Sequence, residues 1–539
     1  MKLNKIIYIV LITILVGSCK QEPIIPEEVV PVTKDPITGT KGTADFTKFI
    51  AIGNSFVAGV QAGALFTDGQ NNSLPSIMAK QFAISGVGGG EFIQPDIKAT
   101  LGWNLFITQP FLKDPTKPIL GRLLLQGASP KPTPQAYAPG NLEALPNPAA
   151  NPAFLYTGGK ASLNNFGVPA IVLGQSLIPQ TGAWAGAGVD PRFSPFYGRL
   201  AYPGGASTII GDAAAAKGTF FMFWLGLDDF FLYAAFGGDP TKAPLTPASG
   251  AGQLGFDVQY GGAIGSLLAS NTNLMGVVGN FPDIFVMPHF TSVKYNAIPL
   301  DDAKSVALNT GFAGYNAALD GLKNPAFNNA FGTATQLDAR KISFIVGSNK
   351  IVIVDESLPS LETGFNTLLG LGAITATQRA QLKPYERARQ TTTTDILPLS
   401  AGSVLGTPGA FGVLGLSEPL PDQYVLIPTE IAEINAARTA FNSIVQGVAS
   451  AYPTRLAFAD VSGALGSLLS NKAGLYNGVT ITPNINPPTG IYSEDGVHPN
   501  SRGYAFISRV FIAAINGKFG ATVPLTDISL YKATALPIP

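Results

Sequence analysis

The chain has 539 residues, of which 46% are hydrophobic and only 13% are charged, whereas an ordinary soluble domain has about 25% charged residues. This balance excludes intrinsic disorder for most of the chain. Lys and Arg together number 34, as do Asp and Glu, and a net charge of zero gives no support for a nucleic-acid partner. The length allows two or three domains, but no internal repeat divides the chain. The sequence is therefore equally compatible with one elaborated domain.

The N-terminus has the pattern of a signal peptide over residues 1–18. Two lysines precede an apolar run over 6–16, which is too short to cross a bilayer comfortably. Small residues then lead to Cys19, the single cysteine, and this junction resembles the bacterial lipobox, in which the cysteine is lipidated. The resemblance implies a lipoprotein of the bacterial cell envelope, held by its lipid at the outer membrane or the cell surface. The alternative is an ordinary secretory signal cut near Ser18, which leaves a free thiol.

Residues 19–43 are predicted to form a semi-extended tether. Four prolines between 20 and 43 exclude a helix or an inner strand there. At roughly 3 Å per residue such a tether spans up to about 70 Å. This reach suits an enzyme or receptor that acts on material outside the lipid layer.

Strand-like and helix-like segments alternate along the rest of the chain, which predicts a parallel sheet. Apolar runs that fit buried strands are found at 46–53, 220–225, 275–281 and 455–461. An amphipathic stretch over 429–448 precedes the last of them. A final helix is predicted to begin after the capping residues Asn500 and Ser501 and to end before Gly517.

Ser55 follows the first predicted strand directly, within Gly53-Asn54-Ser55-Phe56. A serine in a tight turn at the carboxyl end of a first strand stands where an open α/β sheet places its chemistry. Taken alone, the position also fits a serine that caps a helix.

The chain has only two histidines, His289 and His498. Asp495 precedes His498 by three residues, and on a turn it can hold one ring nitrogen protonated while the other accepts a proton from a serine. His289 has no acidic residue beside it in the sequence and is interpreted as a packed or surface histidine without a role. No Cys or His cluster has metal-ligand spacing, so neither a catalytic metal nor a cofactor is expected.

Four short segments, in this order along the chain, resemble the conserved blocks of the SGNH/GDSL hydrolases. Gly-Asn-Ser-Phe at 53–56 and Asp-x-x-His-Pro at 495–499 resemble the first and last blocks. The segment 164–170 resembles the second block, whose backbone N–H groups bind the oxyanion. The segment 226–229, Gly-Leu-Asp-Asp, resembles the third block, which is usually Gly-x-Asn-Asp.

This resemblance implies a three-layer α/β/α fold with about five parallel strands and a serine carboxylic ester hydrolase activity. Ser55 would be the nucleophile, His498 the base and Asp495 its orienting carboxylate. The oxyanion hole would be formed by Ser55, Gly167, Ala170 and Asp228.

One departure from the family pattern bears on activity: Asp228 replaces the asparagine whose amide donates to the oxyanion. Asn54 and Phe56 also replace the Asp and Leu of the usual Gly-Asp-Ser-Leu. A carboxylate in the oxyanion hole is expected to oppose the negative charge of the transition state.

The hydrolase-like domain is predicted to span 44–523, with insertions near 101–160 and 292–428 and a C-terminal tail over 524–539. The first insertion is rich in proline and is expected to be an irregular surface excursion. The second is predicted to contain a hairpin formed by 342–346 and 350–354. Its apolar glycine-rich tracts, 368–374 and 402–416, are interpreted either as packing or as an acyl-binding wall or lid beside Ser55.

Three functional hypotheses follow from these observations. The first is an exported, lipid-anchored serine esterase or lipase that removes acyl or acetyl groups from lipids or glycans. The second is a catalytically weakened binding protein of the same fold, which Asp228 makes credible. The third is a structural lipoprotein of an envelope assembly. The expected partners are an acyl-ester lipid or acylated glycan and, through the anchor, a membrane, but no nucleic acid.

Overall fold

A parallel sheet of five strands organises the core of the protein. Its strands are β1 (Phe49–Gly53), β4 (Asn165–Gly167), β5 (Phe220–Trp224), β6 (Met275–Gly279) and β11 (Leu456–Ala459). They lie in the order β11-β6-β5-β1-β4, and every neighbouring pair is parallel. The predicted α/β fold with about five parallel strands is confirmed.

The computed structural model describes residues 37–105, 120–127, 131–138, 140–141, 154–187, 189–201, 205–250 and 254–536. The predicted signal peptide, Cys19 and most of the predicted tether lie outside these residues, as does much of the insertion 101–160. Residues 38–539 form one compact unit. Within the described ranges, no helix combines the length and apolarity that a membrane span requires.

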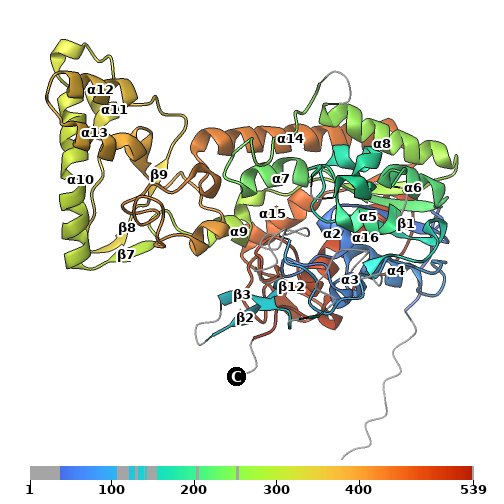
Figure 1. Cartoon of the computed structure of the whole chain (residues 1–539). Coiled ribbons are helices and arrows are strands. Elements are labelled where there is room, and N and C mark those ends of the chain that lie inside the picture. The colour runs from blue at the N-terminus through green and yellow to red at the C-terminus, as the bar shows by residue number, and fades with distance from the viewer. Residues whose placement is uncertain are drawn as a thin grey trace, which may run out of the picture. The chain divides into compact units, whose positions relative to one another are not determined.

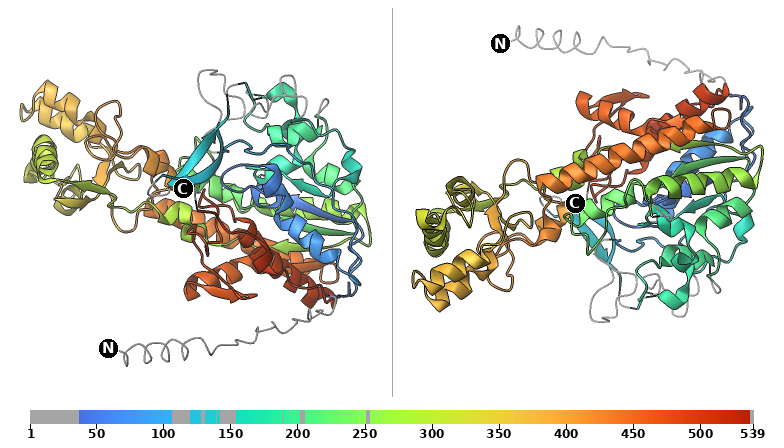
Figure 2. Two further views of the ribbon diagram at one scale, coloured as in Figure 1. Left: turned by 90° about the horizontal axis from the view of Figure 1, so that it is seen from below. Right: turned by 90° about the horizontal axis from the view of Figure 1, so that it is seen from above.

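Helices cover both faces of the sheet, so that the unit has three layers (Figure 2). One face carries α4, α15 and α16, and the other carries α6, α8 and α14, with α7 packed on α14 (Figure 1). The helices of this part are α2 (Ser55–Ala58), α3 (Thr67–Asn71), α4 (Leu74–Phe82), α5 (Pro195–Ala201), α6 (Ile209–Ala215), α7 (Asp228–Ala235), α8 (Phe256–Ser270), α9 (Pro288–Thr291), α14 (Pro428–Ala451), α15 (Val461–Asn471) and α16 (Ser501–Phe519).

The inner strands are apolar along their whole length because helices bury both of their faces. All five residues of β1 and all five of β5 are buried. Aromatic rings join the layers: Phe256 of α8 stacks on Phe441 of α14 with ring centroids 3.9 Å apart. Burying one such side chain contributes about 1.5–3 kcal/mol, so these rings stabilise the helix layer on that face.

The strand order reverses at β1, which fixes where a site can form. The chain passes from β1 to β4 on one side and then crosses to β5 on the other side. In open parallel sheets the carboxyl ends of strands around such a reversal leave a crevice for ligands. Gly53 ends β1 at a close approach, since a Cβ there would lie 2.6 Å from the Trp224 carbonyl oxygen.

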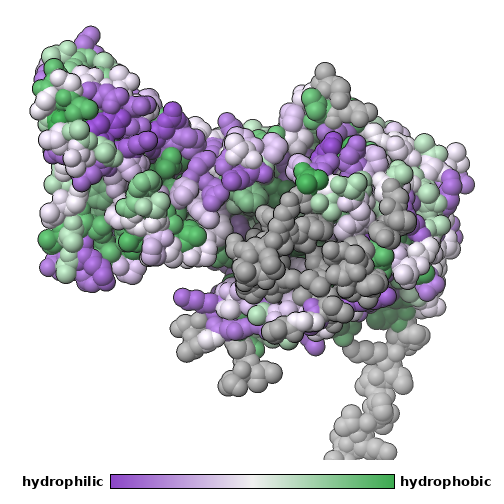
Figure 3. Space-filling model, viewed as in Figure 1, coloured by the Kyte–Doolittle hydropathy of each residue, from purple (hydrophilic) through white to green (hydrophobic). Residues whose placement is uncertain are grey.

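The insertion 292–428 builds two hydrophobic cores of its own. Its elements are β7 (Ile298–Leu300), α10 (Asp302–Leu322), α11 (Ala334–Asp338), β8 (Gly347–Asn349), β9 (Val352–Val354), α12 (Glu362–Gly370), α13 (Ala376–Leu382) and β10 (Ala388–Gln390). Val404, Leu405 and Leu414, from the glycine-rich tract, pack against the second of these cores. Apolar side chains also lie on the surface of the insertion (Figure 3), and the large exposed ones are Val306, Ile345, Val346, Leu371 and Phe411.

The predicted hairpin of 342–346 with 350–354 is wrong. The residues assigned to its turn form β8, which pairs with β7, whereas β9 pairs with β10. The backbone N–H groups of Ile342 and Phe344 donate to the Asn316 and Asn309 side chains of α10 instead of to a strand. Side-chain partners of this kind leave no signal in local hydrophobic patterning.

Two further predictions need correction. The insertion 101–160 is not wholly irregular, because β2 (Leu120–Gln126) and β3 (Lys131–Ala136) form an antiparallel pair. The last helix continues through Gly517 and ends at Phe519, followed by Gly520, which has the left-handed conformation of a helix cap.

The described part of the predicted C-terminal tail contains a one-turn helix, Ile528–Leu530, and Thr526 bonds to Ser508 of α16. The remaining strands, β12 (Gly474–Tyr476) and β13 (Val479–Ile481), form a small hairpin before the last predicted block.

We expect Gly167→Ala to destabilise the fold. A Cβ at this position would lie 2.4 Å from the Ala58 backbone nitrogen and 2.7 Å from the Val57 carbonyl carbon. Because these are backbone atoms of α2, they cannot turn aside, and we expect a loss of about 1–3 kcal/mol.

Gly265→Ala is the matched control, since a Cβ at Gly265 in α8 meets no atom within 4 Å. It should stabilise the helix by up to about 1 kcal/mol. Thermal unfolding followed by circular dichroism compares the two variants. A melting temperature of Gly167→Ala at or above that of the unsubstituted protein would contradict the close packing of α2 on β4.

Candidate active site

Ser55 is the first residue of α2 and lies directly beyond the carboxyl end of β1. Asn54 caps this short helix, because its side chain accepts a hydrogen bond from the Phe56 N–H at 3.2 Å. Gly59 closes the helix with φ +92°. Ser55 is therefore held in a tight turn at the point where the strand order reverses, as the sequence predicts, and its side chain is buried.

A backbone N–H from the loop after β4 faces the Ser55 hydroxyl. The Ala170 N–H donates to Ser55 Oγ at 2.9 Å, and Ala170 has φ +53°, which is uncommon for a residue with a Cβ. Gly167, the other predicted backbone donor, gives its N–H to the Asn165 side chain at 2.9 Å. Ala170 is thus the backbone donor that the structure brings to Ser55.

Asp495 and His498 form a buried pair. His498 Nδ1 lies 2.8 Å from Asp495 Oδ2, and the backbone N–H groups of Val497 and His498 both donate to Asp495 Oδ1 at 2.8 Å. These hydrogen bonds and the neighbouring His498 lower the pKa of Asp495 in spite of its burial. The carboxylate therefore stays ionised and can orient the ring.

The Gly63 N–H and the Ser493 hydroxyl, which no sequence pattern indicates, also hold Asp495. The Gly63 N–H donates to Asp495 Oδ2 at 2.5 Å, and the Ala62 N–H donates to Ser493 Oγ at 2.8 Å. The Ser493 hydroxyl in turn lies 3.3 Å from Asp495 Oδ1 and 2.9 Å from the His498 carbonyl oxygen. Ala62 and Gly63 both have positive φ. Only the glycine hints at such a turn in the sequence, so this support could not be predicted.

The first and last predicted blocks meet in space. The Phe56 ring packs on the His498 ring with centroids 5.1 Å apart. Phe56 therefore joins the turn that holds Ser55 to the turn that holds Asp495 and His498.

Asp228 begins α7, beyond the carboxyl end of β5, and its carboxyl group is buried beside His498. Burial raises the pKa of Asp228 to about 7, because the charged form loses its water. The neighbouring His498 ring, the Asn54 side chain and the Ile171 backbone N–H favour the ionised form but only in part. Near neutral pH both protonation states of Asp228 are accordingly populated.

The neighbouring Asp229 ties two loops to the start of α7. Its carboxylate accepts hydrogen bonds from the Leu173 N–H at 2.7 Å and from the Thr246 hydroxyl at 2.8 Å. Burial again raises its pKa to about 7. Leu173 follows Ala170 by three residues. Asp229 therefore positions the loop from which the Ala170 N–H donates to Ser55.

His289 is packed inside the protein, which is one of the two positions predicted for it. His289 is 6% exposed, and its backbone N–H donates to the Gly496 carbonyl at 3.0 Å. The acidic residue that it lacks in the sequence is Asp495, which the fold brings to it from the last block.

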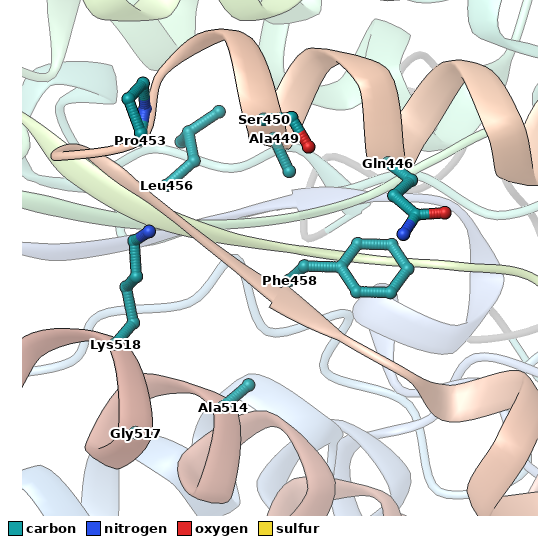
Figure 4. Close-up of a pocket in the computed structure, with 9 residues that line it drawn as sticks. All are labelled: Gln446, Ala449, Ser450, Pro453, Leu456, Phe458, Ala514, Gly517 and Lys518. Atoms are coloured by element: carbon teal, nitrogen blue, oxygen red, sulfur yellow. The ribbon is translucent and has the colours of Figure 1, made fainter.

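Two surface grooves lie apart from these residues. One, of about 520 Å³, lies beside the edge strand β11 between α14 and α16 (Figure 4). The other, of about 980 Å³, lies between α10 and α13 in the insertion. None of the residues that line either groove belongs to the predicted blocks.

A group of three carboxylates, Glu356, Asp422 and Glu430, has oxygen atoms within 4.8 Å of one another. Burial first, and then repulsion within the group, raises the pKa of Glu430 to about 9 and that of Asp422 to about 7. Protons therefore relieve much of the charge in this cluster at neutral pH.

Comparison with known proteins gives no match to a family model, a curated protein or a solved structure. The case for a site therefore depends on where the fold places the predicted residues. It brings Ser55, Ala170, Asp228, Asp495 and His498 to one end of the sheet.

We expect Asp229→Asn to flatten the pH dependence of stability. The folded pKa of about 7 exceeds the unfolded value of about 3.9, so the stabilisation is fully present below pH ~4 and is lost as the pH rises through about 7. The full difference amounts to about 4 kcal/mol. An amide retains an acceptor for the Leu173 N–H, while the Thr246 hydroxyl can turn.

Urea unfolding of both proteins between pH ~4 and ~8 measures this slope. Asp302→Asn, at an exposed aspartate in α10, is the control and should leave the slope unchanged. An equal slope in Asp229→Asn and the unsubstituted protein would mean that Asp229 is ionised throughout this range.

Proposed function

We propose that the protein is a serine ester hydrolase of the SGNH/GDSL type. The observation that carries the proposal is the buried pairing of His498 with Asp495. The His498 ring packs on Phe56, and the hydroxyl of the preceding residue, Ser55, accepts a backbone N–H from Ala170. A nucleophile, an oriented base and an oxyanion donor are the parts that acyl transfer requires. The order of the four resembling blocks along the chain supports the same family.

The mechanism follows from the roles of these groups. With the Nδ1 proton held by Asp495, the other ring nitrogen of His498 can take the proton of Ser55. Ser55 Oγ then attacks the ester carbonyl, and the Ala170 N–H stabilises the negative charge on the carbonyl oxygen. His498 returns the proton to the leaving alcohol, and a water molecule releases the acyl group by the same route.

Acyl or acetyl esters of lipids or glycans are the proposed substrates, and Cys19 is the proposed membrane anchor. The lipobox-like junction before Cys19 and the absence of a second cysteine in the sequence support the anchor. A stable attachment needs more than one acyl chain on such a cysteine. An enzyme tethered in this way would act at the cell envelope.

Hydrolysis of a short-chain chromogenic ester tests the proposal. We expect measurable turnover that falls by about a thousandfold or more in Ser55→Ala and in His498→Ala, with residual activity from binding and the oxyanion donor. Ser443→Ala, at an exposed serine of α14, should keep full activity. Turnover that survives in Ser55→Ala would exclude Ser55 as the nucleophile.

Complete absence of turnover on esters of all chain lengths would favour the second hypothesis, a binding protein of the same fold. The buried carboxyl group of Asp228 is the specific observation that favours it, because above its pKa of about 7 the ionised carboxylate opposes the oxyanion.

We expect Asp228→Asn to raise kcat/KM by about twofold at pH ~7, where about half of the Asp228 carboxyl groups are protonated, and by about tenfold or more at pH ~8 and above. Below its pKa of about 7 the protonated carboxyl can donate to the oxyanion, whereas above it the carboxylate repels the developing charge. Activity of the unsubstituted enzyme should therefore decline as the pH rises past about 7, while the amide, which donates at any pH, extends activity on the alkaline side.

The pH dependence of kcat/KM for both proteins measures this difference. Asp228→Leu is the matched control, because it is neutral but donates no hydrogen bond, and it should not gain the alkaline activity. If Asp228→Asn is equal to or weaker than the unsubstituted enzyme, Asp228 does not contact the oxyanion.

A further inference from the structure

His289 lies at the junction between the sheet and the large insertion. It belongs to α9, which follows β6 and precedes residue 292, where the insertion begins. Its backbone N–H donates to the Gly496 carbonyl at 3.0 Å. Gly496 has φ +71°, and a Cβ there would lie 2.8 Å from the His289 nitrogen. The backbone of α9 is thus in close contact with the turn that runs from Asp495 to His498.

The His289 ring fills a buried site on the inner side of the same turn. Its centroid lies 6.0 Å from that of Phe231 in α7 and 4.9 Å from that of Phe290. The titratable groups that face the ring are Asp495 and His498. The aromatic rings of Phe231 and Phe290 also pack on it.

The ring is neutral at ordinary pH. Burial lowers the pKa of His289 to about 4, although the Asp495 main-chain carbonyl, as a hydrogen-bond acceptor, and the Asp495 charge act in the opposite direction. A neutral imidazole keeps one N–H donor. The Asp495 main-chain carbonyl is the acceptor beside the ring, whereas the backbone N–H groups of Gly63, Val497 and His498 donate to the Asp495 carboxylate.

We propose that His289 is a positioning residue for the Asp495–His498 pair. Its backbone N–H holds the Gly496 carbonyl and its ring N–H serves the Asp495 carbonyl, so that the main chain of the turn is fixed while Gly63 holds the Asp495 carboxylate. The direction from which the Asp495 carboxylate meets His498 Nδ1 then depends on both supports. His289 touches neither Ser55 nor the reacting atoms in this arrangement, and only the kinetic part of the inference rests on the proposed function.

Two substitutions of His289 distinguish the effect of its ring N–H donor from the effect of the packing of its ring. His289→Phe keeps an aromatic ring but removes the donor, whereas His289→Gln keeps a donor. We expect kcat to fall by about 10- to 100-fold in His289→Phe with little change in KM, because a small misplacement of the base is costly in rate. His289→Gln should recover at least part of this loss. Phe290→Leu, which removes packing next to the ring, is the control and should lower the melting temperature without altering the pH dependence of kcat.

Nuclear magnetic resonance of the histidine rings tests the inference without any substrate. The chain has two histidines, so His289→Phe and His289→Gln leave His498 as the single histidine signal. We expect a downfield, slowly exchanging Nδ1 proton of His498 in the unsubstituted protein and in His289→Gln, and a faster-exchanging one in His289→Phe. This result would support the positioning role even if no ester is hydrolysed, in which case the proposed function alone fails.

Two outcomes would overturn the inference. One is an unchanged His498 proton together with an unchanged kcat in His289→Phe. The other is a His289 ring in the unsubstituted protein that titrates near the ordinary value of about 6.5, which would show that it is not held neutral. The second measurement needs no variant, so it decides the question even if His289→Phe does not fold.

Discussion

The buried carboxylate of Asp495 sets a requirement that the rest of the site has to meet. A charged group that is 2% exposed persists only if hydrogen-bond donors replace the water that it has lost. Gly63, Ser493, Val497 and His498 supply these donors, so the first and last parts of the chain have to meet. Asp228 is buried nearby with fewer donors, and its pKa rises where that of Asp495 falls.

Much of the central fold could be predicted because strands buried on both faces are continuous apolar runs. The runs at 220–225 and 275–281 become β5 and β6 within two residues of their expected ends. Prediction failed in the insertion, where β8 and β9 are three residues long and pair with distant segments. Such short strands have no periodicity of their own, and side chains of α10 decide the course of the chain beside them.

The candidate site could be predicted in part. Spacing predicts Asp495 beside His498, and the end of the first strand predicts the place of Ser55. Asp228 is singled out only by the resemblance of 226–229 to the third block. The supports of these residues could not be predicted, because Ala62, Gly63 and His289 reach Asp495 or its turn only through the fold. The case of His289 shows the limit most clearly: the absence of an acidic residue in its own segment says nothing about the segment that packs on it.

A crystal structure of the protein after reaction with a fluorophosphonate tests directly whether Ser55 is the nucleophile and Ala170 the oxyanion donor. We predict a phosphorus bonded to Ser55 Oγ, with a phosphonyl oxygen at about 2.7–3.1 Å from the Ala170 nitrogen and the His498 ring still paired with Asp495. An adduct on another side chain, no adduct at all, or a phosphonyl oxygen directed away from Ala170 would contradict it.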